Sequence, residues 1–346
     1  MPLRFGAMAL QDVFVEAYQS ELRSEEGLFR VVKQGARLGE VPEGLVRSVW
    51  LFPGVGLSRR AVDRLAATRT PCAFLNESGR LVACLLYPPE SNLDARLGQV
   101  RAFTDPELRL AFARRIVQAK LAAQRLFLRA VQKRTPLGPM PACLRSVPPA
   151  PDLEALRGFE GNAAREVFHL LMAAAPETWR AAARSYRPPL DPANALLSLG
   201  YSLATSMVLA VLLAQGLDPY LGMLHQPHHG MPALAADLVE PFRSPLAEAW
   251  FLRTVRSGEI SPDDFEPTDH GFRLRDRDQL RRCVRSFAQA WTSSLSGCRF
   301  DAVSQPREAM VRFVRSVREA FSAGDPERIL LPEPVAARRP SKGEDR

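Results

Sequence analysis

The sequence has few lysines, few cysteines and no long apolar run near its N-terminus. Only four of its 346 residues are lysine, so its 46 cationic residues are almost all arginine. The five cysteines are scattered and include no CxxC pair, which argues against a disulfide framework and against a zinc module. The first residues, MPLRFGAMALQDVF, contain no signal-peptide core. These absences predict a protein of the reducing cytoplasm.

Apolar and basic residues, in contrast, are abundant. Apolar residues make up 46% of a chain that is long enough to bury the cores of two domains. The formal net charge is +8, and arginine is the side chain that binds phosphate bidentately. This composition fits a nucleic-acid-binding protein, although a GC-rich genome produces the same excess of arginine. Charge alone leaves both explanations open.

The N-terminal part of the chain has the pattern of β-strands. Runs rich in β-branched and aromatic residues, separated by turn-forming residues, lie at 12–18, 28–34 and 49–52 and in a hairpin over 72–87. Ser58 is a good N-cap for one short helix between them. We therefore expect a small, mainly antiparallel β domain over residues 1–88.

The pattern changes after this domain. Two prolines and a polar segment indicate a linker over 89–104, and beyond it the apolar period changes from 2 to about 3.6. We expect a larger all-α catalytic domain over 105–330, with a helix break near 158–161 and a short two-stranded excursion around Gly271. The Pro-rich, charged tail over 331–346 is typical of disorder. The predicted fold class is α+β.

Residues 192–217 contain no charged side chain and are long enough to span a membrane. Polar residues nevertheless recur at steps of three and four along the segment: Asn194, Ser198, Tyr201, Ser202 and Thr205. A helix with such a stripe is better explained as the core helix of a globular α domain, with the stripe turned towards an internal site. We expect no membrane association.

The segment over residues 221–243 has the strongest chemical signal. It contains three of the five histidines and two carboxylates: His225, His228, His229, Asp237 and Glu240. A helix that begins at Pro232 places the two carboxylates, three residues apart, on one face. Imidazole and carboxylate ligands suit Mg²⁺ or Mn²⁺, whereas structural zinc normally recruits thiolates. A zinc cluster built on HQPHH is the alternative.

Four segments follow one another in a characteristic order: FEGNAARE, RPPLDPANALLSLGYSL, DPYLGMLH and DLVEPFR. In this order they resemble the CRISPR adaptation integrase, the CRISPR-associated protein 1 family. The resemblance runs from the first strands to about residue 325, and it is strengthened by Arg96 with Gln99 and by Lys120 with Gln124. One departure is that Glu248 stands where the family tends to have an aspartate after the PFR segment.

The resemblance implies a catalytic site. Glu160, His225 and Glu240 would hold Mg²⁺ or Mn²⁺, and Asp237 would support them as a further catalytic carboxylate. A second set of residues would contact DNA: Asn194, Tyr201, His228, His229 and Arg243. For Arg243 the alternative is an ion pair with Glu240, and for the polar-stripe residues it is a buried hydrogen bond.

The resemblance also implies a function. Such a protein inserts short duplex DNA into a CRISPR array by attack of 3′-hydroxyl ends on phosphodiesters, in prokaryotic antiviral defence. Its expected partners are double-stranded DNA, a second copy joined through the β domain, and the small ferredoxin-like adaptation subunit, CRISPR-associated protein 2. Two rival functions remain: a catalytically silent DNA-binding scaffold, and a zinc hydrolase that uses the HQPHH cluster.

Overall fold

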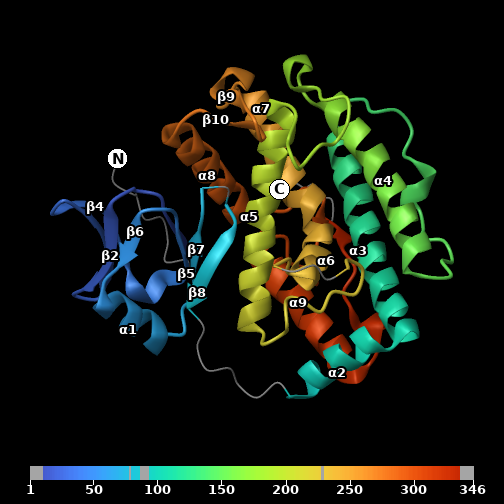
Figure 1. Ribbon diagram of the computed structural model, residues 1–346, viewed down its shortest axis with the longest axis horizontal. Coiled ribbons are helices and arrows are strands. Elements are labelled where there is room, and N and C mark those ends of the chain that lie inside the picture. Colours follow the sequence, from blue (N-terminus) through green and yellow to red (C-terminus); the bar gives the residue numbers. More distant parts are fainter. Residues whose placement is uncertain (1–10, 78, 86–92, 227–229, 336–346) are drawn as a thin grey trace, which may run out of the picture.

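The computed structural model describes residues 11–77, 79–85, 93–226 and 230–335. A strand-rich N-terminal part packs beside a larger helical part (Figure 1). The predicted α+β class is therefore confirmed.

Two four-stranded sheets form the N-terminal part. The first contains, in spatial order, β1 (Gln11–Val15), β5 (Val46–Leu51), β7 (Cys72–Leu75) and β8 (Leu81–Leu85). The second contains β4 (Ala36–Pro42), β3 (Leu28–Lys33), β2 (Ser20–Glu25) and β6 (Val55–Leu57). Helix α1 (Arg59–Ala67) follows Ser58, whose hydroxyl caps it by accepting from the Ala61 N–H at 3.1 Å. Leu22, Phe29 and Leu65 are buried between these elements.

The expectation of mainly antiparallel sheets is corrected. Strands β1 and β5, β5 and β7, and β2 and β6 pair in parallel, while β2 with β3, β3 with β4 and β7 with β8 pair antiparallel. The connections through β2–β4 and through α1 return the chain in the same direction beside an earlier strand. Alternating hydrophobicity predicts that a segment is a strand but not the direction of its partner.

The helical part contains eight long helices in the described residues. They are α2 (Leu93–Thr104), α3 (Pro106–Gln132), α4 (Leu153–Ala174), α5 (Pro192–Ala214), α6 (Ala233–Phe242), α7 (Ala249–Ser257), α8 (Arg277–Thr292) and α9 (Pro306–Ala323). Short 3₁₀ turns lie at Glu43–Leu45, Ala142–Leu144, Glu177–Trp179, Pro262–Asp264 and Pro326–Arg328. The excursion around Gly271 is the hairpin of β9 (Phe265–Thr268) and β10 (Gly271–Leu274), as predicted.

Three boundaries differ from those expected. Residues 93–104 are helix α2 and not linker, and α2 packs so closely on α9 that a Cβ at Gly98 would lie 1.9 Å from the Phe321 carbonyl oxygen. The start of the expected disordered tail is ordered, because β12 (Glu333–Pro334) pairs with β11 (Cys298–Arg299). Helix α4 continues through Gly158 and Gly161 without a break. Both glycines have open space around them, and their cost of about 1 kcal/mol each is borne by a 22-residue helix.

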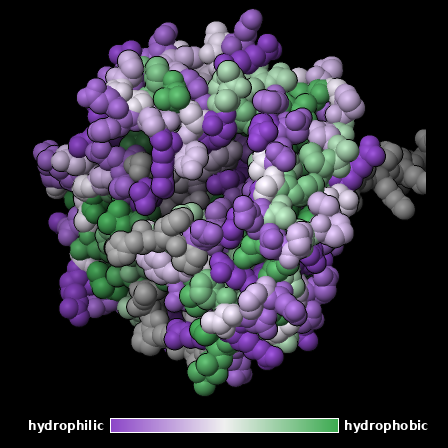
Figure 2. Space-filling view, turned by 45° about the vertical axis from the view of Figure 1, so that its right-hand side comes forward, coloured by the Kyte–Doolittle hydropathy of each residue, from purple (hydrophilic) through white to green (hydrophobic). Residues whose placement is uncertain are grey.

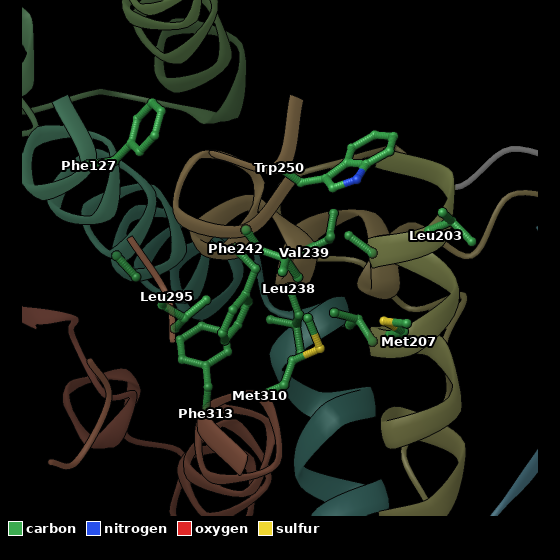
Figure 3. Close-up of a cluster of buried hydrophobic side chains, with 14 of the residues drawn as sticks. Phe127, Leu203, Met207, Leu238, Val239, Phe242, Trp250, Leu295, Met310 and Phe313 are labelled. Atoms are coloured by element: carbon green, nitrogen blue, oxygen red, sulfur yellow. The ribbon is translucent and has the colours of Figure 1, made fainter. Parts of the chain in front are cut away.

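Helix α6 lies at the centre of the helical core (Figure 3). Its Leu238, Val239 and Phe242 point among side chains of neighbouring helices: Phe127 of α3, Leu203 and Met207 of α5, Trp250 of α7, and Met310 and Phe313 of α9. A π-helical segment, Arg243–Glu248, joins α6 to α7. Segments of this kind are frequent at functional sites. The carboxylates on α6 are therefore held on a rigid, buried element.

Helix α5 is long and apolar enough to cross a membrane by length and composition. It instead packs inside the helical part (Figure 1), where Leu196, Ala204 and Val208 are fully buried. Its Ser206 hydroxyl also donates to the Gly79 carbonyl and accepts from the Leu81 N–H, each at 2.8 Å, which ties α5 to the β part. These contacts are those of the core helix that the sequence predicted.

The surface is largely hydrophilic on the face shown in Figure 2, which is hollowed near its centre. Hydrophobic residues on that face form several small groups.

Candidate active site

Asp237 organises the chain around His225. Its carboxylate is fully buried on α6, and it accepts backbone N–H groups from Met223 at 2.6 Å, Leu224 at 3.0 Å and His225 at 2.9 Å. The same carboxylate lies 2.6 Å from Nδ1 of the His225 ring. This contact fixes the ring and leaves Nε2 as the nitrogen available to a ligand, as in carboxylate–histidine–metal arrangements. Burial lowers the pKa of His225, but the hydrogen bond to Asp237 and its charge outweigh this effect and raise it.

Residues 216–226, here called the histidine loop, are also held from outside. Arg96 on α2 donates to the Gly216 carbonyl at 2.9 Å. Gln99, one turn along, donates to the Asp218 carbonyl at 2.7 Å and accepts the Asp218 N–H at 2.9 Å. These bonds pair backbone groups of the loop with two side chains of α2. They explain why a glutamine is buried on α2.

Two further arginines form hydrogen bonds with the end of the histidine loop. Arg109 of α3 donates to the Met223 carbonyl at 3.1 Å, and Arg157 of α4 donates to the Leu224 carbonyl at 2.6 Å. Gly222 lets the loop lie against the start of α6, because a Cβ there would be 2.7 Å from Cβ of Ala233. The histidine loop is therefore held against four helices, α2, α3, α4 and α6.

Glu160 and Glu240 meet at Lys120. The Lys120 ammonium of α3 contacts Glu160 Oε1 of α4 and lies 2.5 Å from Glu240 Oε2 of α6. Arg243 lies 2.9 Å from the other oxygen of Glu240. These four residues are called the carboxylate cluster below. The side chains of Lys120 and Glu240 are 3% and 2% exposed, so the cluster is deep, while Glu160 is 19% exposed and opens it to solvent.

Charge within the cluster controls the ionisation of Glu240. Burial alone raises the pKa of this carboxyl, but the charges of Arg243, Lys120 and His225 outweigh it and lower the pKa to about 2. Of these three charges, that of His225 contributes least to the lowering. Among the described residues no three His, Cys, Asp or Glu side chains are arranged as a ready metal cage. The Lys120 ammonium stands between the two glutamates.

A cavity of about 330 Å³ adjoins the cluster. Its walls carry Lys120, Gln124, Gly161, Ala164, Arg165, Phe168, His169, Ala183, Arg184, Tyr201, Arg243 and Glu248. The Tyr201 hydroxyl donates to Glu248 at 2.7 Å, and the Tyr201 ring faces the guanidinium groups of Arg184 at 5.3 Å and Arg243 at 4.7 Å. Burial, followed by the nearby charge of Glu248, raises the pKa of Tyr201 well above its usual value. The cavity is basic and contains a neutral phenol.

The polar stripe on α5 reaches this internal site only in part: Tyr201 lines the cavity, whereas the Ser198 hydroxyl accepts from Arg184 at 3.0 Å. The amide of Asn194 is fully buried and accepts from Arg184 at 2.8 Å and from the Ser185 N–H at 3.1 Å. It also donates to the Ala183 carbonyl at 2.9 Å and to Asp191 at 2.6 Å. The expectation that Asn194 contacts DNA is corrected, because its hydrogen-bonding groups are used to hold the start of α5.

The other expected DNA contacts have different outcomes. Tyr201 and Arg243 line the cavity, and Arg243 also makes the alternative ion pair with Glu240. His228 and His229 lie outside the described residues, so the HQPHH zinc cluster has no structural test here.

The sequence was compared with protein families and with known proteins. The family described as CRISPR associated protein Cas1 matches residues 13–289. A Thermus thermophilus protein named CRISPR-associated endonuclease Cas1 3 is 32% identical over 286 residues, which are 82% of this chain and 84% of that protein. The chain belongs to the Cas1 family. The recognised resemblance is thereby confirmed.

Solved structures show the same fold. A Cas1 protein from Thermotoga maritima superposes with a TM-score of 0.73 at 24% identity, covering 91% of this Cas1-family chain and 98% of that one. A casposase bound to its integration product gives 0.74 at 20% identity, covering 91% of both chains. A chain of a Cas6-RT-Cas1–Cas2 complex gives 0.70 at 22% identity, covering 95% of this chain and 36% of that one.

The donor set of this Cas1-family chain fits a hard divalent ion. Two carboxylates converge on one point, and their charge is offset by the side-chain cations Lys120 and Arg243. The imidazole beside them has its Nδ1 occupied by Asp237 and its Nε2 free of that contact. Carboxylate oxygens with a single imidazole suit Mg²⁺ or Mn²⁺. The ligand roles of Glu160, His225 and Glu240 stay predictions that this geometry supports.

Sequence reasoning assigned no role to Lys120, Arg157 or Arg184. A signal for Lys120 was present, because it interrupts the apolar stripe of α3 between the buried Ile116 and Ala123. A lysine on a buried face requires a carboxylate partner. The two arginines carried no such signal, because an arginine is common on a solvated helix or loop and nothing in the sequence showed that Arg157 reaches the Leu224 carbonyl or that Arg184 reaches Asn194.

Proposed function

We propose that this protein is a divalent-metal-dependent DNA endonuclease and integrase that inserts short duplex DNA into a CRISPR array. The observation that carries the proposal is the convergence of Glu160 and Glu240 from separate helices on Lys120, with the Asp237-oriented His225 on the neighbouring loop. Lys120 and Arg243, which pair with these glutamates, also line a basic cavity. Membership of the Cas1 family and the endonuclease name of its Thermus relative support it.

Glu160, Glu240 and Nε2 of His225 would hold Mg²⁺ or Mn²⁺. When bound, such an ion supplies Lewis-acid polarisation of a phosphoryl oxygen and orientation of the reacting groups. The protein's own residues have separate tasks. Asp237 keeps the proton of His225 on Nδ1, so that Nε2 stays a lone-pair donor.

The cavity beside the carboxylate cluster would bind DNA phosphates. Arg165, Arg184 and Arg243 would neutralise phosphate charge, and Tyr201, kept protonated by its raised pKa, adds no negative charge and donates to Glu248 at the cavity wall. In strand transfer the 3′-hydroxyl oxygen of the incoming strand bonds to phosphorus while the target P–O3′ bond breaks. The hydroxyl proton leaves to solvent, and the departing 3′-oxygen is protonated. With water as nucleophile the same site hydrolyses DNA.

The proposed partners are double-stranded DNA, a second copy of the chain and a Cas2-type subunit. The complex that contains Cas1 and Cas2 among the similar folds supports the last of these. Dimerisation through the β part and a cytoplasmic location stay predictions.

The test is strand transfer of a labelled short duplex into a supercoiled plasmid that carries a CRISPR repeat, with the Cas2-type subunit and Mn²⁺ or EDTA. We expect Mn²⁺-dependent joining or nicking that falls by about 10³-fold in His225→Ala, in line with the loss of a group that acts in the transition state. His270→Ala, which removes an exposed imidazole on the β9–β10 turn, is the matched control and should retain activity.

Two results would contradict the proposal. If the wild type binds the duplex but neither joins nor cuts it with any divalent ion, the protein is a DNA-binding scaffold. If activity requires tightly retained zinc and does not depend on DNA, the HQPHH hydrolase is the better explanation.

A further inference from the structure

Lys120 stands in the position where the two glutamates converge. Its ammonium contacts Glu160 and Glu240 together, and its side chain is only 3% exposed. We propose that Lys120 is a displaceable internal cation, which holds the two carboxylates together until a divalent ion replaces it. The inference rests on the proposed function, because it concerns the same metal site.

The contacts show why the ammonium has to move. Glu240 uses Oε1 for Arg243 and Oε2 for Lys120, and Glu160 uses Oε1 for Lys120. A divalent ion held by both glutamates needs an oxygen from each of them. An ammonium and a divalent ion that shared these oxygens would repel each other in a buried site, where charges interact strongly. Lys120 must therefore release at least one carboxylate when the ion binds.

The structure also offers the ammonium another acceptor. Gln124 lies one turn further along α3 and is 3% exposed, and its Oε1 has no hydrogen-bond partner among the described residues. Side chains four residues apart on a helix are neighbours. Lysine has a flexible four-carbon stem, and Lys120 and Gln124 both line the 330 Å³ cavity. We assign Gln124 Oε1 as the acceptor to which Lys120 turns.

This arrangement gives Lys120 two effects of opposite sign. Without metal it stabilises the fold, because two buried carboxylates at one point would otherwise repel each other. With metal it competes, because its release is a cost that reduces the apparent affinity for the ion. A residue that only supported the ligands would act in one direction, since its loss would weaken metal binding.

The test measures Mn²⁺ binding and unfolding without any DNA. Free Mn²⁺ is counted by electron paramagnetic resonance during titration of the purified full-length chain, and thermal midpoints are recorded with Mn²⁺ and with EDTA. In Lys120→Met we expect Mn²⁺ affinity to rise by about tenfold or more, the midpoint in EDTA to fall, and the increase caused by Mn²⁺ to become larger. Lys133→Met, the same change at the exposed end of α3, should leave all three unchanged.

Equal or weaker Mn²⁺ binding by Lys120→Met would overturn the inference, because it would make Lys120 a support for the ligands. Gln124→Leu provides an independent variant that keeps the lysine. It should weaken Mn²⁺ binding several-fold, because the displaced ammonium loses its acceptor, and unchanged binding would remove Gln124 from the proposal. If the wild type binds no Mn²⁺ at all, the proposed function fails as well. If it binds Mn²⁺ and joins DNA while Lys120→Met shows no gain in affinity, only this inference fails.

Discussion

The histidine loop and the carboxylate cluster are coupled through helix α6, yet they are stabilised in different ways. Asp237, on the loop side, contacts the His225 imidazole and accepts from three backbone N–H groups, which cannot leave without unfolding the loop. Glu240, three residues along, is neutralised by the side-chain charges of Lys120 and Arg243, and its buried Oε2 has no hydrogen-bond partner among the described residues. The histidine loop is thus fixed by backbone hydrogen bonds, whereas the carboxylate cluster is neutralised by side-chain cations that can move. The proposed metal site would therefore be preorganised on the imidazole side and exchangeable on the carboxylate side.

The strongest test of this contrast is removal of the fixed half. Asp237→Ala leaves three buried N–H groups and the His225 ring without their acceptor, and we expect a loss of about 3 to 5 kcal/mol in the free energy of unfolding. Chemical denaturation in EDTA measures it. Asp63→Ala, which removes an exposed ion pair with Arg59, should change stability by less than about 1 kcal/mol. Equal losses in the two variants would show that Asp237 has no special structural role.

Low pH should remove the stabilisation that the carboxylate cluster provides. The pKa of Glu240 in the folded state, about 2, is below the ordinary value of 4.5, so its charge stabilises the fold above that ordinary value and stops doing so as pH falls towards about 2. At neutral pH the contribution is roughly 3 kcal/mol. Glu240→Gln lacks it, so the stability difference between wild type and variant, measured in EDTA, should shrink as pH falls below 4.5. A difference that stays constant down to pH 3 contradicts this account.

The smallest of these effects is expected at the contact between the loop and α6. In Gly222→Ala the new Cβ would lie 2.7 Å from Ala233 Cβ and 2.8 Å from its carbonyl carbon, so the loop has to shift. We expect a destabilisation of about 1 to 3 kcal/mol and weaker Mn²⁺ binding. Gly158→Ala, at an exposed helical position with open space, should instead stabilise by up to about 1 kcal/mol. Thermal unfolding of both variants checks the pair, and a neutral Gly222→Ala would mean that the loop yields freely.

Sequence reasoning located the helix that carries Asp237 and Glu240, the core character of α5 and the hairpin around Gly271. These features depend on local rules: a proline at a helix start, a period of 3.6, and turn-forming glycines. Sequence reasoning was wrong where a segment's structure depends on a contact with residues far away in the sequence. The polar surface of α2 resembled a linker because its partner α9 lies more than 200 residues away, and Asn194 resembled a DNA contact because the segment that buries it, around Arg184, carries no motif.

The sequence by itself determined the family, the fold class and the positions of the acidic and histidine residues, because these follow from local pattern and from motifs in a fixed order. Only the tertiary structure decided which groups form hydrogen bonds and ion pairs with these acidic and histidine side chains. Asp237 was given a supporting role by resemblance, yet its three backbone donors appear only when the loop folds against α6. Lys120 reaches Glu160, 40 residues on, and Glu240, a further 80 residues on, because α3, α4 and α6 pack at one point. Because these charged side chains are buried, they interact more strongly than they would in water, and burial is a property of the packed molecule.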